Sequence, residues 1–600
     1  MKISFLRRAG LLTLIGATLI SMASCIKINE ELGKNLIPTH QLWDVFSPDA
    51  VALEDVVLKA SDSLSAYSTR RITFGSINDD ILGSSEKVTS FTLVPVIKDL
   101  DFGENTVVKQ FHFSAVRDTV STVNDNQARM MQNIYVFSLK EPLDSTILYT
   151  NSLAEGVKSE DGTTTNYEKF LDLSKLIAKG IPVYNGGDSL SFDFTKEYAE
   201  SVVEGIKEFR KIYTEKKDTL LSDYLDLIPG IYMKSETPQG IGGRINMFDL
   251  ALEFDSNGYI SGNFAELKVT ADYGDRKQVD TSFIFVFGPS AFVEESSTTV
   301  PTQYAFNGST HASDALYTVG VKATDKIYVE GGCGVKPVIT AAGIKKLVNQ
   351  QIDEAGIANP NEVVINKATI ILPYNVNGDW SKLEKYPTIL SPTVRLRGTG
   401  DDGDKYVSYA GLTDASIESE NQGDINRSLS LYSPDISHHV QEILKLQQED
   451  GETDADFEAR VAKYDIWMLI MHEEITVTTS AGGSNNDYYN NLLYNSYYNN
   501  MMYDPYGYGY GYGGYGYGYG GYGYGYGGYG YDSYGYGSNY YNYMMMASYM
   551  NSASNSSESI SIDLDKDRYY NCTLGGPTSD ELKPTLKITF SAPKTAEKNN

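Results

Sequence analysis

The chain contains few of the residues from which catalytic and metal sites are usually built. Its 600 residues include three cysteines, six histidines and three tryptophans. His438 and His439 are adjacent, so on a helix they point to different faces, whereas a shared metal ion needs i, i+4 spacing. No GxSxG elbow is present, and Cys333 has no histidine close to it in the sequence. We therefore predict no catalytic residues, no metal site and no cofactor, and expect a protein that is not an enzyme.

Positive charge is also scarce. Lysine and arginine together number 50 against 78 acidic residues, which gives a net charge of -28. Such an excess of acid repels phosphate backbones instead of neutralising them. Nucleic acid is therefore excluded as an expected partner.

Long hydrophobic runs are missing after the N-terminus. Lys2, Arg7 and Arg8 precede a short apolar segment, the pattern of a secretory signal peptide over residues 1–24. The residues before Cys25 read MAS and resemble a bacterial lipobox, in which the cysteine becomes the lipidated N-terminus. The alternative is an ordinary signal peptide that is cut near Ala23. No later stretch approaches ~20 apolar residues. We therefore expect the mature chain to lie in the aqueous phase and to be held to the membrane by its lipid anchor.

The residues after the predicted lipid site bear on localisation. Glu30 and Glu31 weakly resemble export signals of surface lipoproteins in Bacteroidota. We expect a lipid-anchored protein of the outer membrane. The sequence allows a location on the periplasmic face or on the cell surface, and it slightly favours the cell surface.

The two remaining cysteines, Cys333 and Cys572, lie far apart in the sequence. Their spacing excludes a CxxC redox or zinc motif. They could pair in an oxidising envelope, but two separate buried thiols are the favoured state.

Short runs of alternating apolar and polar residues recur along most of the chain and predict β-strands, as in RRITFGSI and INKATIILP. The expected fold is mainly β, with antiparallel β-sandwich-like domains and a few covering helices. Helices are predicted near 196–217, 340–356 and 435–449 from apolar residues at spacings of three and four. EFDSNGYISGNF, from Glu253, lacks a complete set of calcium ligands and predicts a β-hairpin turn instead.

The predicted organisation has six parts. After the signal peptide come a tether over 25–50, a β-rich domain over 51–290 and a second β-rich domain over 291–483. Residues 484–556 are a low-complexity insertion rich in Tyr, Gly, Asn and Met, and 557–600 supply strands that complete the second domain.

The insertion contains three tandem copies of YGYGYGG over 508–528. In a strand, a seven-residue repeat would move the tyrosines to the opposite face in each copy, and alternate glycines cost too much backbone entropy for a packed core. We therefore predict a disordered loop between two late strands.

Several segments together resemble a known family. They are ELGKNLIPTHQLWDVF, IYVFSLKEPLDSTILYTN, GIYMKSETPQGIGGRINMFDL, YVEGGCGVKP, INKATIILP and PTLKITF. In this order they resemble the Bacteroidota lipoproteins that contain DUF4270, a domain of unknown function. The resemblance implies lipidation at Cys25, and it provides no activity or catalytic residues to carry over, because none are established for the family.

Asp-Ser and Asp-Thr pairs followed by a small apolar residue or Thr match the O-glycosylation signal of Bacteroidota. The candidate acceptors are Ser63, Thr119, Ser145, Ser189 and Thr219.

The function that we predict is binding or surface structure without catalysis. Glycans or the surface matrix are the expected ligands, with Trp43, Trp380 and the tyrosines of the low-complexity insertion as candidate contacts. One alternative is a structural subunit that contacts outer-membrane proteins in an assembly or export complex, and a minor alternative is a secreted hydrolase. The oligomeric state stays open.

Overall fold

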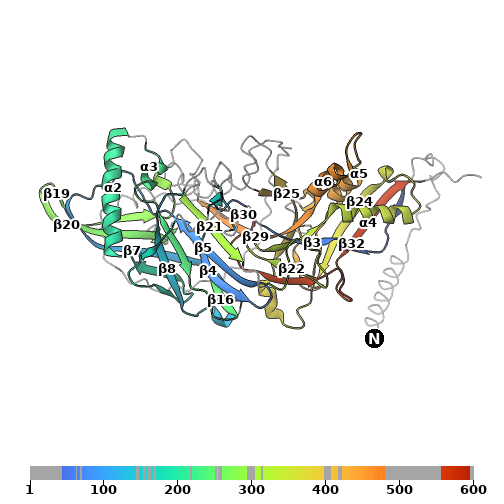
Figure 1. The fold of residues 1–600 in the computed structure, drawn as a ribbon, viewed down its shortest axis with the longest axis horizontal. Coiled ribbons are helices and arrows are strands. Elements are labelled where there is room, and N and C mark those ends of the chain that lie inside the picture. The colour runs from blue at the N-terminus through green and yellow to red at the C-terminus, as the bar shows by residue number, and fades with distance from the viewer. Residues whose placement is uncertain are drawn as a thin grey trace, which may run out of the picture.

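The computed structural model describes residues 43–594, apart from gaps at 62–63, 68–70, 124, 144–147, 153–156, 159–163, 166–170, 217–218, 251–252, 255–259, 293–303, 312–314, 398–406, 416–421 and 480–555. Two β-rich bodies follow one another along the long axis of the molecule (Figure 1). The first body contains a 13-stranded sheet, and the second body contains two six-stranded sheets.

The sheet of the first body is antiparallel throughout. Its order is β12 (Leu171–Leu176), β8 (Gln132–Leu139), β15 (Ile231–Ser235), β5 (Gly83–Phe91), β4 (Arg71–Asp79), β16 (Gly242–Asp249), β7 (Glu104–Thr122), β19 (Phe264–Tyr273), β20 (Arg276–Val286) and β6 (Val94–Pro95). Three more strands join it: β13 (Val183–Tyr184) on β8, β14 (Ser189–Asp193) on β7 and β21 (Ala305–His311) on β5. Because β6 follows β5 after two residues and pairs with β20, the far edge of the sheet turns back toward β5.

Alternation along β7 places aromatic side chains inside this curved sheet. Phe111 and Phe113 are buried, and the Phe113 ring stacks on Phe192 and on Phe287 at centroid distances of 4.7 and 5.0 Å. Burying such a ring contributes roughly 1.5–3 kcal/mol. Helix α2 (Lys196–Lys216) covers the core with a stripe spaced by three and four, which includes Val202 and Ile206, and α3 (Leu221–Leu225) follows it.

The second body has its own core between sheets and helices. One sheet runs β1 (Trp43–Phe46), β32 (Thr585–Pro593), β24 (Val364–Pro373), β28 (Leu431–Tyr432) and β27 (Ile425–Asn426), with β2 (Val51–Ala52) also on β32. The other runs β26 (Val407–Gly411), β25 (Ile389–Arg397), β29 (Ile466–Thr479), β23 (Val335–Ile339) and β3 (Val56–Ala60), with β30 (Ser556–Leu564) on β29. Helices α4 (Ala341–Glu354), α5 (Ser437–Lys445) and α6 (Asp454–Val461) lie along one side (Figure 1).

The remaining elements are short. Two-stranded ribbons pair β17 (Glu253–Phe254) with β18 (Ile260–Gly262) and β22 (Lys326–Glu330) with β31 (Asn571–Gly575). A small sheet joins β9 (Leu148–Tyr149), β10 (Val157–Lys158) and β11 (Thr164–Thr165). The 3-10 helices are η2 (Asp125–Gln127), η5 (Ser290–Phe292), η7 (Pro360–Glu362), η8 (Trp380–Lys385), η9 (Thr413–Ala415) and η10 (Ala462–Tyr464).

Strands from the two ends of the chain complete the second body. β1 and β2 pair with β32, and β3 pairs with β23. Conversely, β21 lies after residue 290 in the sequence but pairs with β5 of the first body. The two bodies therefore divide the chain differently from the boundaries drawn at 50 and 290, because strand pairing depends on partners that lie hundreds of residues away.

The predicted fold class is confirmed as mainly β, with antiparallel sheets and few helices. The three predicted helices correspond to α2, α4 and α5, and β17 and β18 form the predicted hairpin. Helices α3 and α6 were not predicted. The predicted disorder of 484–556 lies outside the described residues except for Ser556, which begins β30. β30 pairs with β29 up to Thr479 opposite Ser556, so the strands that flank the insertion are neighbours.

Within the described ranges, no helix is both long enough and apolar enough to span a membrane.

Candidate functional site

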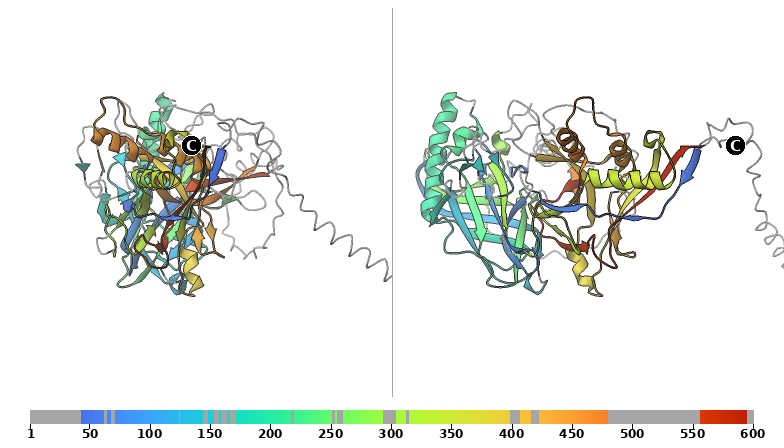
Figure 2. Two further views of the ribbon diagram at one scale, coloured as in Figure 1. Left: turned by 90° about the vertical axis from the view of Figure 1, so that its right-hand side faces the viewer. Right: turned by 45° about the vertical axis from the view of Figure 1, so that its right-hand side comes forward.

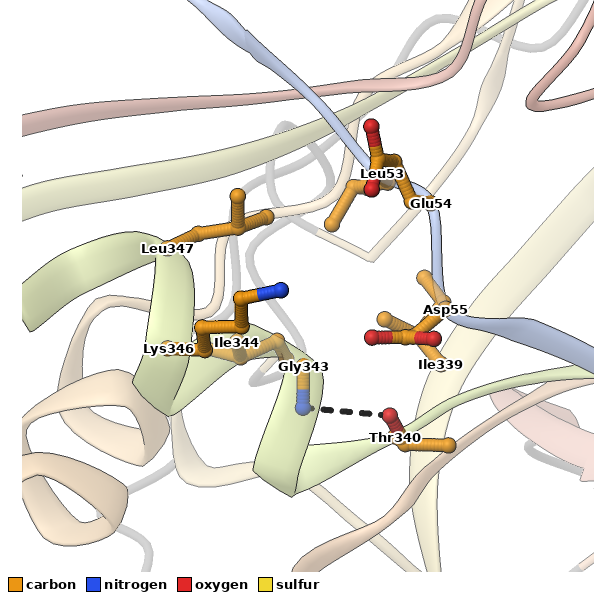
Figure 3. Close-up of a pocket in the computed structure, with 9 residues that line it drawn as sticks. All are labelled: Leu53, Glu54, Asp55, Ile339, Thr340, Gly343, Ile344, Lys346 and Leu347. Carbon is orange, nitrogen blue, oxygen red and sulfur yellow. Dashed lines mark hydrogen bonds between the residues drawn. The ribbon is translucent and has the colours of Figure 1, made fainter. Parts of the chain in front are cut away.

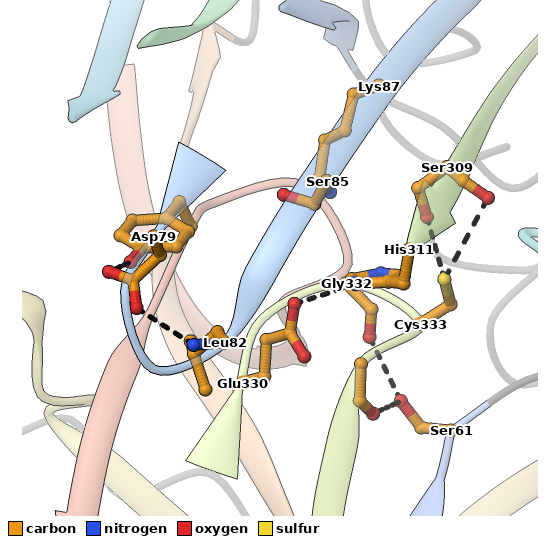
Figure 4. Close-up of polar contacts among 12 residues, drawn as sticks. Ser61, Asp79, Leu82, Ser85, Lys87, Ser309, His311, Glu330, Gly332 and Cys333 are labelled. Carbon is orange, nitrogen blue, oxygen red and sulfur yellow. Dashed lines mark hydrogen bonds and ion pairs between the residues drawn. The ribbon is translucent and has the colours of Figure 1, made fainter. Parts of the chain in front are cut away.

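A cluster of polar and ionisable side chains lies at the junction between the two bodies (Figure 4). From the first body, β21 contributes Ser309 and His311. From the second body come Glu330 at the end of β22, Cys333 in the turn that follows and Lys336 in β23. We call these five residues the junction cluster.

Three glycines make the turn of the junction cluster sterically feasible. Gly332 has a φ of +61°, in the left-handed region that favours glycine. A Cβ on Gly331 would lie 2.2 Å from the carbonyl oxygen of Arg568, and a Cβ on Gly334 would lie 2.4 Å from the carboxyl carbon of Glu330. The sequence GGCG is thus explained by the left-handed backbone at Gly332, the close approach of the Arg568 backbone and the packing of the turn against the Glu330 side chain.

Glu330 is the centre of charge in the junction cluster. Its side chain is 2% exposed, its Oε1 lies 2.7 Å from His311 Nδ1, and its Oε2 accepts a hydrogen bond from the Tyr317 hydroxyl at 2.5 Å. Burial alone would raise the pKa of Glu330, but the His311 ion pair and the hydrogen bonds hold it below the ordinary value. Burial likewise opposes a charged His311, yet Glu330 and Cys333 hold its pKa well above the ordinary value. The directions of both pKa shifts favour the ion pair of His311 with Glu330.

Cys333 is 4% exposed, and its sulfur lies 2.9 Å from the Ser309 hydroxyl. Burial would raise the pKa of the Cys333 thiol, but His311, Ser309 and Lys87 together leave it lowered. Electrostatics thus favour thiolate character in a sulfur that solvent scarcely touches.

The Lys336 side chain binds the backbone of the turn. Its ammonium donates hydrogen bonds to the carbonyl oxygens of Glu330, Gly332 and Gly334, and to the Ser61 hydroxyl at 3.2 Å. Burial lowers its pKa to about 8, although Glu330 and Cys333 oppose that shift. The carbonyl oxygens of Gly332 and Gly334 also accept from the Ser61 hydroxyl, so Lys336 and Ser61 together bind the backbone of the turn.

The segment after β30 also crosses to the first body. Asp79 Oδ2, in β4, accepts hydrogen bonds from the Tyr569 hydroxyl at 2.6 Å and from Asn571 Nδ2 at 2.9 Å. Asp565 accepts from two backbone amides, from Arg568 and from the Tyr570 hydroxyl, so its pKa falls to about 2 despite burial. These contacts hold residues 565–571 in place against the junction.

Chemically, the junction cluster contains the residue types of a thiol nucleophile, a base and an orienting carboxylate. Substrate would have to reach the sulfur, however, and both Cys333 and Glu330 are buried. A nearby hollow of about 310 Å³, open solvent included, is lined by Lys87, Asn307 and Ser309 among others, but not by Cys333. In this conformation the cluster is suited to holding the two bodies together.

Sequence reasoning missed this cluster because it looked for a histidine close to Cys333 along the chain. His311 lies on β21, well before the turn in the sequence. The pairing of β21 with β5 brings it close to the turn. The three glycines of GGCG were the signal in the sequence that could have indicated this site, since glycines mark places where two backbone segments approach closely.

A second hollow lies at the N-terminus of α4 (Figure 3). Thr340 caps the helix, with its hydroxyl accepting from Gly343 N at 3.1 Å, and the Ala341 amide donates to Asp465 Oδ1 at 3.0 Å. Asp55 and Glu54 also face this end of the helix. Local side chains therefore already supply the acceptors and negative charge that a helix N-terminus attracts.

The predicted modification sites have different surroundings. Cys25, Ser63 and Ser145 lie outside the described residues. Ser189 is exposed at the start of β14, and Thr119 is half-buried in β7. Thr219 is 3% exposed, so the folded chain does not present this hydroxyl to a glycosyltransferase.

The other predicted residues are not brought together. Trp43 and Trp380 are both exposed, on β1 and η8. His439 is buried while its neighbour His438 is exposed, which confirms that they point to different faces. Cys333 and Cys572 are both buried free thiols, the state favoured by the sequence. Among the described residues, no group of three or more His, Cys, Asp or Glu could hold a metal ion.

No family model, no curated protein and no solved structure matches the chain.

Proposed function

We propose that this chain is a lipid-anchored protein of the outer membrane, attached through Cys25, with a binding or surface-structural role and no catalysis. The observation that carries the proposal is the position of the first described strand. β1 pairs with β32 at one end of the long axis, and α2, β19 and β20 lie at the other end (Figures 1 and 2). A tether that leads into β1 would hold the second body near the membrane and present the first body outward.

The junction cluster supports a role without catalysis. Its cysteine, carboxylate and lysine are buried and already bonded to one another or to backbone groups. Buried ionic groups of this kind are well suited to fixing one arrangement of two units. An elongated protein that presents a surface benefits from a rigid junction.

Glycans or the surface matrix are the ligands that we propose first, because Trp43 and Trp380 offer exposed aromatic faces. The test combines cell fractionation with a glycan array. The Cys25→Ala variant should move to the soluble fraction, and the purified variant should bind specific glycans. Continued membrane association of the variant would contradict lipidation, and an empty array would contradict glycan binding.

The second candidate is a structural subunit that contacts outer-membrane proteins. It is favoured by an exposed apolar surface beside two arginines of the first body, Arg117 and Arg129, that donate to one carbonyl oxygen. A pulldown from detergent-solubilised membranes should then recover defined outer-membrane proteins in fixed ratio, whereas specific glycan binding without such proteins would exclude this candidate.

A further inference from the structure

Three arginine side chains gather around the loop between β13 and β14. Arg117 Nη1 and Arg129 Nη1 both donate hydrogen bonds to the carbonyl oxygen of Gly186, at 2.8 and 2.9 Å. Because both bonds end on one oxygen, the two nitrogens lie within roughly 6 Å of each other. Two guanidinium groups are therefore held side by side at the surface of the first body.

The third arginine builds the loop from inside. Arg244 is 2% exposed and donates to the carbonyl oxygens of Ala128, Met130 and Tyr184. Gly186 has a φ of +70°, and a Cβ there would lie 2.1 Å from the Ala128 carbonyl oxygen. The glycine and the buried arginine together fix the carbonyl at which Arg117 and Arg129 meet.

In the described part of the chain, few carboxylates lie close enough to neutralise the positive charge of the three arginines. Asp188 lies 3.3 Å from Arg117 Nη2, but its side chain is 90% exposed, so the pair is weak. Within the ranges that the structure describes, no carboxylate pairs with Arg129 or Arg244. Burial lowers the pKa of Arg244 to about 10, and repulsion from Arg129 and Arg117 adds to that shift. A concentration of cations in a chain of net charge -28 attracts acidic groups.

An apolar surface adjoins the arginines. Met130 and Met131 follow Arg129 directly and are 53% and 68% exposed. Val183, which is 54% exposed, lies opposite Asn133 in the pairing of β13 with β8, so Met131 falls on the same face of the pair. Ile181 extends this face by two residues and is also exposed. Flexible methionines let such a surface adapt to a partner.

We propose that Arg117, Arg129, Met130, Met131, Ile181 and Val183 form a docking surface for an acidic protein segment that also carries apolar side chains. We call these residues the docking surface. The arginines would bind carboxylates by charge-assisted hydrogen bonds, and the methionines and aliphatic side chains would bury the apolar residues between those carboxylates. The proposal deepens the second candidate function, because it names the chemistry of the protein partner.

The test uses the soluble Cys25→Ala chain, so it does not depend on lipidation. The probe is a fluorescein-labelled peptide of about twelve residues that alternates glutamate with leucine, and its counterpart replaces each glutamate by glutamine. Fluorescence anisotropy at low ionic strength should show binding of the acidic peptide, at least tenfold weaker binding of the glutamine peptide and a loss of affinity when salt is added.

Matched variants locate the binding. Arg129→Gln should weaken binding of the acidic peptide at least tenfold, and Met131→Ser should weaken it several-fold. Arg210→Gln is the control, because Arg210 is an exposed arginine of the same body that already pairs with Asp99 and Asp101 at 2.6 and 2.8 Å. Circular dichroism should show that all variants keep their fold.

Three results would overturn the proposal. Absence of peptide binding to the parent chain, or equal binding to Arg129→Gln, would remove the docking surface while leaving the anchored role untouched. Binding of an acidic oligosaccharide such as oligogalacturonate, lost in Arg129→Gln, with no peptide binding would assign the arginines to a glycan. A dimer that Arg129→Gln dissociates would make a second copy of the chain the partner.

Discussion

The charged pair of His311 and Glu330 gives the sharpest test of the junction cluster. The change is Glu330→Gln, which keeps the shape of the side chain and an acceptor for the Tyr317 hydroxyl but removes the negative charge. Glu330 is 2% exposed and His311 Nδ1 lies 2.7 Å away, so the variant leaves a buried imidazolium without its partner. Removing one member of a buried ion pair typically costs about 3–5 kcal/mol, and we expect a loss of this size in the free energy of unfolding.

The loss should depend on pH in a defined window. The pKa of His311 is raised in the folded state, so its contribution is complete below the ordinary value of 6.5 and declines as pH rises through the folded value. The pKa of Glu330 is lowered, so its contribution is complete above the ordinary value of 4.5 and is lost as pH falls through the folded value. The difference between parent and variant should therefore be largest between pH 4.5 and 6.5 and smaller in both directions beyond that window.

Urea unfolding followed by tryptophan fluorescence at several pH values measures this difference. Glu449→Gln is the matched control, because Glu449 lies 3.7 Å from Arg460 but its side chain is 76% exposed, and it should leave the unfolding midpoint unchanged. The double variant Glu330→Gln with His311→Asn should recover part of the loss, because it also removes the imidazolium that the single variant leaves without its carboxylate. If Glu330→Gln behaved like Glu449→Gln, or if its effect were the same at pH 6 and pH 9, the charged pair would not hold the junction.

Two further predictions concern the cysteines and the insertion. Cys333 and Cys572 should react with iodoacetamide at least about a hundredfold more slowly in the native chain than in urea, because both are buried, and fast native labelling of Cys333 would show that the junction opens. Deletion of residues 484–555 should preserve the fold, because β29 and β30 are already neighbours up to Thr479 and Ser556. If the segment is the loop that the sequence predicts, shortening it from roughly 76 to about four residues should add up to about 2–3 kcal/mol to the free energy of unfolding, as measured by urea denaturation. Loss of the cooperative transition would contradict the predicted loop.

The local elements were predictable because their signals are local. Apolar residues at spacings of three and four fixed α2, where Val202, Ile206 and Phe209 are all buried. Alternation located strands such as β24 and β32, whose Ile370 and Leu586 face each other in the core. Helix α6 escaped because its only buried residue is Val461, so it carries no apolar stripe to recognise.

The assignment of strands to bodies was not predictable in the same way. Val56 in β3 lies opposite Ile339 in β23, and Phe46 in β1 lies opposite Phe590 in β32. Each strand has the same alternating pattern as its neighbours in the sequence, so periodicity does not distinguish which distant strand it will join. The docking surface illustrates the same limit, since Arg117 and Arg129 meet at Gly186 only after β7, β8 and β13 are in place.

The order of segments around the insertion constrains what the insertion can do. Residues after it supply β30, β31 and β32, and they also bring Tyr569 and Asn571 to Asp79 of the first body. Truncation at residue 480 would therefore remove strands of both sheets of the second body and all of the polar contacts between residues 565–571 and the first body. Removing only the insertion would spare them. The YGYGYGG copies thus lie between two parts of the chain that must meet, and a role for them has to be one that leaves the pairing of β29 with β30 intact.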